Sequence, residues 1–194
     1  TLQDMEVRVN NLKTRNGEGT VDRELHPLWH GKHTEIKPLY NNDITTVSLM
    51  KNTNTFRIVM QMLDDASIDV NDYDFRIISP NGRYNHGNEL QNDEETEKVE
   101  YTVYHTENDD ETGAIAELNT LRLMTVKDNR LVITHKSTGK SILDIPLNKY
   151  LNALRLEQYS GLSLQEYLDR SDKYGIVLFF KGMDSEGNYI SVDM

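Results

Sequence analysis

A chain of 194 residues with a formal net charge of −11 repels nucleic-acid phosphates and anionic membrane surfaces, so neither is expected as a partner. The absence of cysteine excludes disulfides, thiolate nucleophiles and zinc–thiolate sites. Only 37% of the residues are hydrophobic, but they form periodic runs that can build a core. No run approaches the roughly 20 apolar residues of a membrane-spanning helix.

Alternation of apolar and polar side chains is the main pattern along the chain. Phe56, Ile58 and Met60 fall on one face of an expected strand, and Arg57 and Gln61 fall on the other. Runs of this kind recur at short intervals and predict about ten strands. They are Met5–Val9, Ile44–Met50, Thr55–Leu63, Tyr73–Ile78, Val99–Tyr104, Leu118–Val126, Leu131–Thr134, Ser141–Ile145, Ile176–Phe180 and Tyr189–Val192.

The segments between many of these strands have the composition of tight turns. Glycine, proline, asparagine and aspartate favour the backbone conformations that reverse the chain. Many short strands without alternating helices predict an all-β fold, an antiparallel β-sandwich. The turn segments are Pro80–Gly82, Asp128–Asn129, Ser137–Gly139 and Asp184–Gly187.

Two short helices interrupt this pattern near the C-terminal strands. Helical spacing of apolar residues predicts the first at Asn148–Gln158. Ser163 and Glu166 form a capping-box signature that predicts a second helix over Leu164–Tyr174, ending at Gly175. The continuous apolar run Ile176–Phe180 predicts a strand that is buried on both faces.

The remaining segments are polar. Asn10–His30 contains two glycines and a proline, and we interpret it as a linker or loop. Asn88–Lys98 and Thr106–Gly113 are rich in acidic residues and are expected to be loops.

Two clusters have side chains that bind metals. His26, His30 and His33 could bind zinc or nickel, but Pro27 and Gly31 prevent one helix from presenting all three, and a solvated connecting segment is the alternative. The second cluster, Asp69–Asp74, resembles the start of a calcium-binding loop. However, Asp74 stands where such a loop has its glycine at the sixth position, and Pro80 stands where it has its closing glutamate at the twelfth. It could be a looser calcium site shared with Asn81 or Asn85, or a set of turn residues. The calcium candidates are Asp69, Asn71, Asp72 and Asp74.

Motifs for catalysis are absent from the sequence. There is no Gly-x-Ser-x-Gly elbow, no P-loop and no glycine-rich dinucleotide turn. With 32 acidic residues, no single carboxylate pair indicates a glycosidase. We therefore expect neither catalytic residues nor a cofactor, and a secreted hydrolase is the least favoured alternative.

Several segments between about Leu28 and Phe180 occur in a recognisable order. The most specific is Leu164–Arg170 beside the apolar strand Tyr174–Phe180. The other segments are Leu28–Gly31, Thr46–Asn54, Phe56–Gln61, Arg76–Tyr84 with Asn88, Leu121–Met124, and Ile145–Leu147 leading to Tyr150 and Leu151. Together these segments resemble the FimB/Mfa-type fimbrial anchor and minor-subunit family of Bacteroidales.

The resemblance implies a cell-surface lipoprotein of two transthyretin-like β-sandwich domains, held in the outer membrane by a lipidated cysteine. Such a protein anchors fimbriae, influences their length and joins major and accessory subunits by strand donation. An adhesive or carbohydrate-binding module that contacts a host glycan or protein is the alternative.

The family also implies a domain division, and the pattern of the second helix predicts roles for a few of its residues. Residues 1–32 are expected to be the tail of a preceding sandwich plus a linker, and residues 33–194 the second sandwich. No lipidated cysteine is present, so lipid anchorage is inferred from the family alone. Leu164, Tyr167 and Leu168 are expected to pack the second helix onto the sandwich. Asp169 and Arg170 are expected either to pair with each other or to be solvated.

Overall fold

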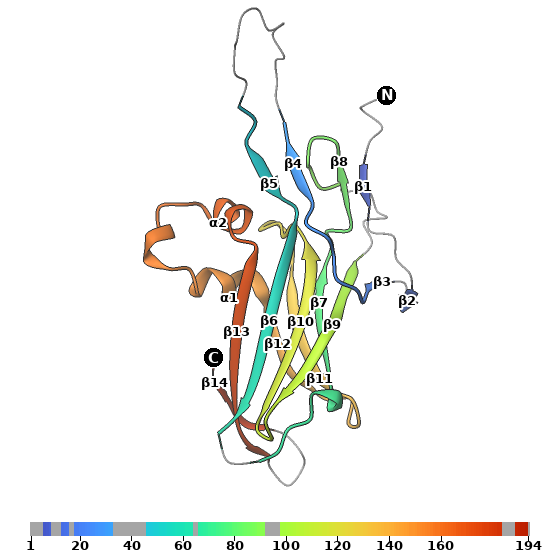
Figure 1. The fold of residues 1–194 in the computed structure, drawn as a ribbon, viewed down its shortest axis with the longest axis vertical. Helices are drawn as coiled ribbons and strands as arrows, with labels where there is room; N and C mark the ends of the chain where they lie inside the picture. Colours follow the sequence, from blue (N-terminus) through green and yellow to red (C-terminus); the bar gives the residue numbers. More distant parts are fainter. Residues whose placement is uncertain are drawn as a thin grey trace, which may run out of the picture.

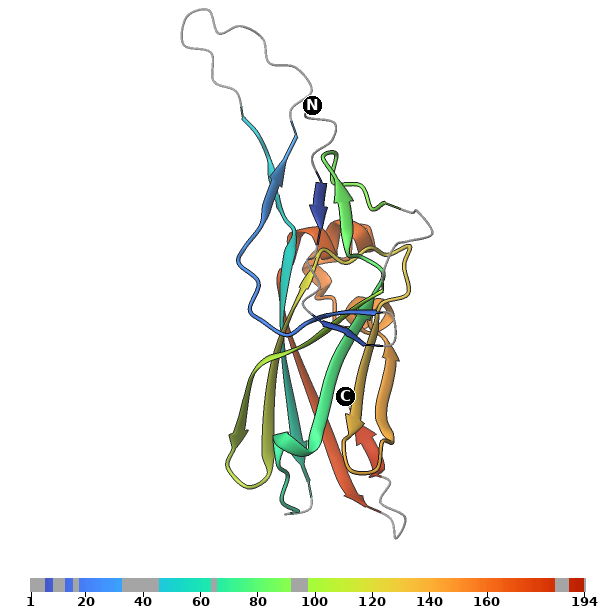
Figure 2. The ribbon, with the colours of Figure 1, turned by 90° about the vertical axis from the view of Figure 1, so that its right-hand side faces the viewer.

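The computed structural model describes residues 6–8, 13–15, 18–32, 46–63, 66–91, 98–183 and 189–193. A long sheet curls so that its two halves face each other, with two short helices near one end (Figures 1 and 2). This arrangement confirms the prediction of an all-β sandwich. Neither helix is long enough to cross a membrane, and the described part of the chain has no longer one.

The main sheet runs in the order β12-β11-β7-β9-β10-β6-β13-β14, and β3 pairs with both β2 and β9. Strand β9 joins the halves, because its first residues pair with β7 and its later residues pair with β10. The strands of this sheet are β2 (Lys13–Arg15), β3 (Glu18–Val21), β6 (Thr53–Met62), β7 (Tyr73–Ser79), β9 (Val99–Asp109), β10 (Gly113–Leu121), β11 (Arg130–His135), β12 (Ser141–Pro146), β13 (Lys173–Met183) and β14 (Tyr189–Asp193).

The core lies between the two halves and follows the alternation read from the sequence. Phe56, Ile58 and Met60 of β6 are fully buried, while Arg57 is exposed on the other face. The ring of Phe56 stacks on Tyr174 of β13 at 4.9 Å between centroids. Burial of such a continuous apolar layer is the main stabilising contribution in a sandwich of this size.

Two strand pairs run parallel, which the turn composition could not predict. Strand β13 lies parallel to β6 from Lys173↔Thr55 to Phe180↔Met62, and β3 lies parallel to β9. Parallel neighbours require a long connection. For β6 and β13, that connection includes most of the domain and both helices.

Both helices are shorter than predicted. Helix α1 spans Leu147–Ala153 and is followed by a 3-10 turn, η3 (Glu157–Tyr159). Helix α2 spans Leu164–Arg170, so Tyr174 and Gly175 belong to β13 instead. The predicted capping box at the start of α2 is present in both directions.

The prediction that Ile176–Phe180 is buried on both faces is wrong. Ile176, Leu178 and Phe180 are fully buried, whereas Val177 is 44% exposed and Phe179 is 36% exposed. The strand therefore has one core face and one apolar outer face. It reads as a continuous apolar run because the outer face is also apolar.

Two other boundaries differ from the prediction. Strand β9 continues through the first half of the expected loop Thr106–Gly113 to Asp109, where it turns into β10. Strand β10 ends at Leu121, so the expected strand Leu118–Val126 is placed too late in the chain. Both faces of β10 are largely buried, which removes the alternation that would locate it.

Two small antiparallel ribbons stand at the end of the sandwich that carries α2 (Figure 1). In the first, β4 (Trp29–Gly31) pairs with β5 (Leu49–Lys51). Val47 and Leu49 lie over Gly31, where an added Cβ would come within 2.8 Å of either side chain. In the second, β1 (Glu6–Arg8) pairs with β8 (Arg83–Asn85). The segment interpreted as a linker, Asn10–His30, thus contains β2, β3 and the start of β4.

Removing the cap of α2 is expected to loosen the helix. Ser163→Ala should lower the free energy of unfolding by about 1 kcal/mol, because the Glu166 amide loses its acceptor. Urea denaturation checks this value. Ser160→Ala, an exposed serine that caps no helix N-terminus, is the control, and an equal loss there would contradict the capping role.

Candidate functional site

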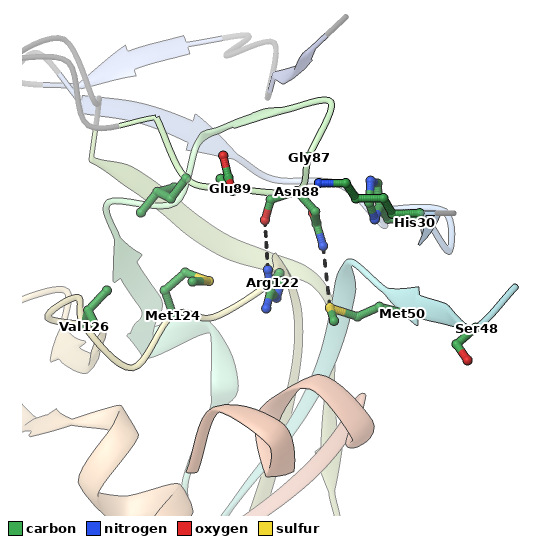
Figure 3. A pocket seen from close by; sticks show the side chains of 11 residues that line it. His30, Ser48, Met50, Gly87, Asn88, Glu89, Arg122, Met124 and Val126 are labelled. Atoms are coloured by element: carbon green, nitrogen blue, oxygen red, sulfur yellow. Dashed lines mark hydrogen bonds between the residues drawn. The ribbon is translucent and has the colours of Figure 1, made fainter. Parts of the chain in front are cut away.

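A pocket of about 610 Å³ lies at the ribbon end of the sandwich (Figure 3). The β4–β5 ribbon, the turn at residues 87–90 and the loop after β10 form its walls. This volume is in the range of small-molecule and peptide pockets. The lining residues are His30, Lys32, Ser48, Met50, Gly87, Asn88, Glu89, Leu90, Arg122, Met124 and Val126.

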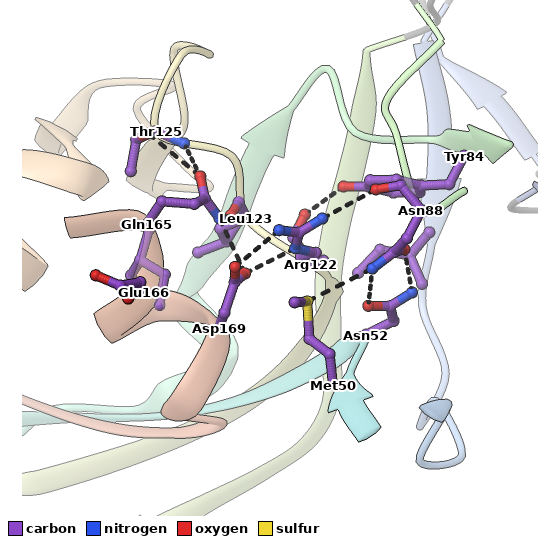
Figure 4. A network of polar contacts seen from close by, with 12 residues as sticks. Met50, Asn52, Tyr84, Asn88, Arg122, Leu123, Thr125, Gln165, Glu166 and Asp169 are labelled. Carbon is purple, nitrogen blue, oxygen red and sulfur yellow. Dashed lines mark hydrogen bonds and ion pairs between the residues drawn. The ribbon is translucent and has the colours of Figure 1, made fainter. Parts of the chain in front are cut away.

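A buried ion pair lies beneath the pocket. The Arg122 guanidinium donates from Nε and Nη2 to both carboxylate oxygens of Asp169, at 2.7 and 2.8 Å. Its Nη1 donates to the Asn88 carbonyl at 3.0 Å (Figure 4). The two charged side chains are only 11% and 13% exposed. The bidentate geometry holds the end of β10 against α2 and orients Arg122 at the pocket floor.

Asn88 fixes the turn above this arginine. Its φ of 62° lies in the left-handed region, which asparagine tolerates better than most residues. Its side-chain amide exchanges hydrogen bonds with that of Asn52 at 2.5 and 3.1 Å. Its Nδ2 also contacts the Met50 sulfur at 3.5 Å. Two sequence-distant segments are thereby joined across the pocket.

Two buried tyrosines, Tyr84 and Tyr101, also hold the loop after β10 in place. The Tyr84 hydroxyl donates to the Arg122 carbonyl at 2.5 Å, and the Tyr101 hydroxyl donates to Asn81 at 2.7 Å. Asn81 donates in turn to the carbonyls of Leu121 and Arg122. Burial raises the pKa of Tyr84 and of Tyr101, so both hydroxyls stay protonated and act as donors.

Helix α2 also holds the loop after β10, through the side chain of Gln165. The Gln165 Nε2 donates to the Leu123 carbonyl at 3.1 Å and to the Asp169 carboxylate at 2.9 Å. Its Oε1 accepts from the Thr125 amide at 2.9 Å. The side chains below the pocket therefore form one connected polar network, which is a rigid base for binding.

Several polar side chains that line the pocket are engaged by neighbouring groups. His30 and Ser48 both line it, but the His30 Nε2 is hydrogen-bonded to the His86 carbonyl at 2.9 Å. The Glu89 carboxylate accepts from the Asn85 amide. Within the described residues, neither His30 nor Glu89 contacts Ser48, and much of the lining is methionine and aliphatic side chains.

The predicted histidine cluster is only partly described. His26 is exposed, His30 bonds to the His86 carbonyl, and His33 lies outside the described residues. No group of three metal-binding side chains occurs in the ranges given above. A metal at this cluster stays a prediction.

The calcium candidates lie within or next to one 3-10 turn, η2 (Val70–Asp72). Asp69 caps the turn, and its Oδ1 accepts from the Asn71 amide at 2.9 Å and from Asn108 at 3.2 Å. Asp74 is the second residue of β7, and its carboxylate lies 3.9 Å from the Lys136 Nζ. Asn81, which was considered as a shared calcium ligand, instead donates hydrogen bonds to the carbonyls of Leu121 and Arg122 in the buried network. Calcium binding at Asp69, Asn71, Asp72 and Asp74 stays a prediction.

The Asp69 contacts predict a pH effect. The hydrogen bond from the Asn71 backbone, and then that from Asn108, lowers the pKa of Asp69 below its ordinary value. A carboxylate with a depressed folded-state pKa contributes stability above its unfolded pKa and loses it as the pH falls. The urea midpoint of the wild type should therefore fall more than that of Asp69→Asn between pH 5 and pH 3, a window around the ordinary aspartate pKa of 3.8. Parallel curves for the two proteins would contradict this role.

The α2 residues behave as expected with one exception. Tyr167 and Leu168 are buried at 8% and 3% exposure, and Leu164 packs partly against the core. Asp169 pairs with Arg122, not with the neighbouring Arg170. Successive helix residues point in different directions, which explains why the adjacent pair does not form.

Sequence reasoning missed the central residues of the site. Arg122, Asn88 and Asn52 belong to segments that resembled the family, but they received no role. Only Asn52 lies between two predicted strand ends, whereas Arg122 falls inside the predicted strand Leu118–Val126 and Asn88 begins an expected loop. Their partners are 34 to 47 residues away, and no local pattern identifies them.

The sequence model of one protein family, described as "Fimbrillin-A associated anchor proteins Mfa1 and Mfa2", matches residues 1–194. No curated protein sequence is a significant match. Among solved structures, a proposed adhesin from Bacteroides ovatus superposes with a TM-score of 0.78 at 26% identity, over 99% of this chain and 62% of that one.

Two more solved structures are similar. A proposed polysaccharide-binding protein from Bacteroides thetaiotaomicron has a TM-score of 0.74 and 30% identity, over 99% of this chain and 64% of that one. The fimbrial anchor protein Mfa2 from Porphyromonas gingivalis has a TM-score of 0.65 over 94% of this chain and 62% of its own, and at 18% identity it shows the fold alone. The chain thus spans less than two thirds of the length of these relatives.

Proposed function

This chain belongs to the family of fimbrillin-A associated anchor proteins, and from that membership we propose that it anchors or assembles fimbriae at the bacterial cell surface. The observation that carries the proposal is the family match over all 194 residues. The role is structural and non-enzymatic, with fimbrial major and accessory subunits as partners and the outer membrane as its location. Regulation of fimbrial length belongs to the same proposal.

We propose that residues 1–32 connect to a preceding β-sandwich and that residues 33–194 form the second one. The greater length of the solved relatives supports this division. In the described residues, β3 nevertheless pairs with β9 and places Val21 in the core, so this connecting region also packs on the second sandwich.

Joining of subunits by strand donation is also proposed. Edge strand β12 is paired on one side only, by β11, among the strands that the structure places. An edge strand offers unpaired amides and carbonyls that an added strand can satisfy. This chemistry is consistent with strand donation and does not identify the donor.

The anchoring role is tested by purifying the affinity-tagged full-length protein from its native bacterium. A fimbrial subunit should co-purify with the wild type, and deletion of the gene should release fimbriae into the medium or change their length. An unrelated tagged outer-membrane lipoprotein is the control. Fimbriae that stay attached and unchanged without this protein would contradict the proposal.

A carbohydrate-binding or adhesive role is the second candidate. It is favoured by the name of the 30%-identical relative, described as polysaccharide-binding, and by the presence of a pocket. A glycan array with and without a calcium chelator tests this role and the Asp69–Asp74 site together. If no glycan binds with or without the chelator, the carbohydrate-binding role is contradicted.

A further inference from the structure

The two ends of the pocket differ in chemistry. Figure 3 shows Met124 and Val126 at one end and His30 and Ser48 at the other, with Arg122 between them. Lys32 follows β4 and lines the pocket as well. One end is therefore apolar, and the other carries the cationic side chain of Lys32.

The apolar end lacks a partner within the described fold. Val126 is 80% exposed, although it borders a cavity. The adjacent ribbon is similarly open, with Trp29 at 55% and Leu49 at 62% exposure. A group of exposed apolar side chains around a cavity more often marks a surface that binds a partner than one that stays exposed to solvent.

The lining favours a peptide over a sugar. Among the described residues, no tyrosine, tryptophan or phenylalanine lines the pocket, and sugar hydroxyls buried against Met124 and Val126 would lose their hydrogen bonds. Methionine side chains adapt to apolar side chains of different shapes. Arg122 is neutralised by Asp169, and among the described residues Lys32 supplies a further cation at this site. Glu89 also lines the pocket, which disfavours a ligand that is acidic throughout.

We propose that this pocket binds an extended peptide segment of a fimbrial subunit, with an apolar side chain between Met124 and Val126 and an acidic side chain near Lys32. The inference rests on the proposed function and names the surface through which the partner is held. Apolar contact supplies the affinity, and the charge at the ribbon end sets the direction of the peptide.

Exposed residues allow a test that leaves the fold intact. Purified full-length protein is mixed with fimbriae sheared from a strain that lacks it, and bound fimbriae are quantified. Val126→Asp and Lys32→Glu should each weaken binding on the order of tenfold. Leu156→Asp and Lys181→Glu are matched controls, because both positions are exposed and do not line the pocket. Variants that bind like the wild type would overturn the proposal.

Photocrosslinking identifies the occupant. A benzoylphenylalanine at position 126 should crosslink to a subunit peptide that has an apolar residue within a few positions of an acidic one, and the same probe at position 156 should not. A crosslink to a glycan, or to another segment of the same protein, overturns the inference while leaving the anchoring role intact. If the wild type binds no fimbriae, the anchoring role fails as well.

Discussion

Asp169→Ala is expected to lower the free energy of unfolding by about 3–5 kcal/mol. The substitution leaves the Arg122 guanidinium buried without its counter-charge, since the arginine side chain is only 11% exposed. It also removes an acceptor from Gln165 of the same network. Urea denaturation followed by circular dichroism measures the loss.

Two controls separate burial from simple loss of an ion pair. Asp144→Ala breaks the Arg130–Asp144 pair, whose side chains are 34% and 47% exposed, and should cost about 1 kcal/mol or less. The double variant Arg122→Met with Asp169→Leu should be less destabilised than Asp169→Ala, because no charge remains buried. Equal losses for Asp169→Ala and Asp144→Ala would show that burial of Arg122 has no energetic weight.

Strands with one buried face could be predicted from the sequence, whereas strands buried on both faces could not. In β6 and β7 the apolar residues alternate with polar ones, and the predicted ranges match closely. In β10 both faces are covered, so no alternation marks its start at Gly113. The outer part of β9 is charged and resembles a loop, yet its backbone pairing with β10 holds it as a strand.

The helices and the site show the limit of local patterns. The Ser163–Glu166 capping box is a contact between residues three apart, and it was predictable. The end of α2 was not, because Lys173 and Tyr174 are drawn into β13 by pairing with Thr55 and Phe56, more than 100 residues earlier. The pocket depends on contacts of the same long range. The sequence pattern could not place its residues against one another.

The adjacent residues Phe180 and Phe179 of β13 provide the sharpest test of its one-sided burial. Phe180→Ala should lower the free energy of unfolding by about 3–5 kcal/mol, because a fully buried ring leaves a cavity in the sandwich. Phe179→Ala should cost about 1 kcal/mol or less, since that ring is 36% exposed on the outer face. The two variants share the residue type, the strand and the loss of β-propensity, so only burial distinguishes them. Equal urea midpoints would mean that the outer face is covered in solution, and a partner bound over Phe179 would then have to be sought.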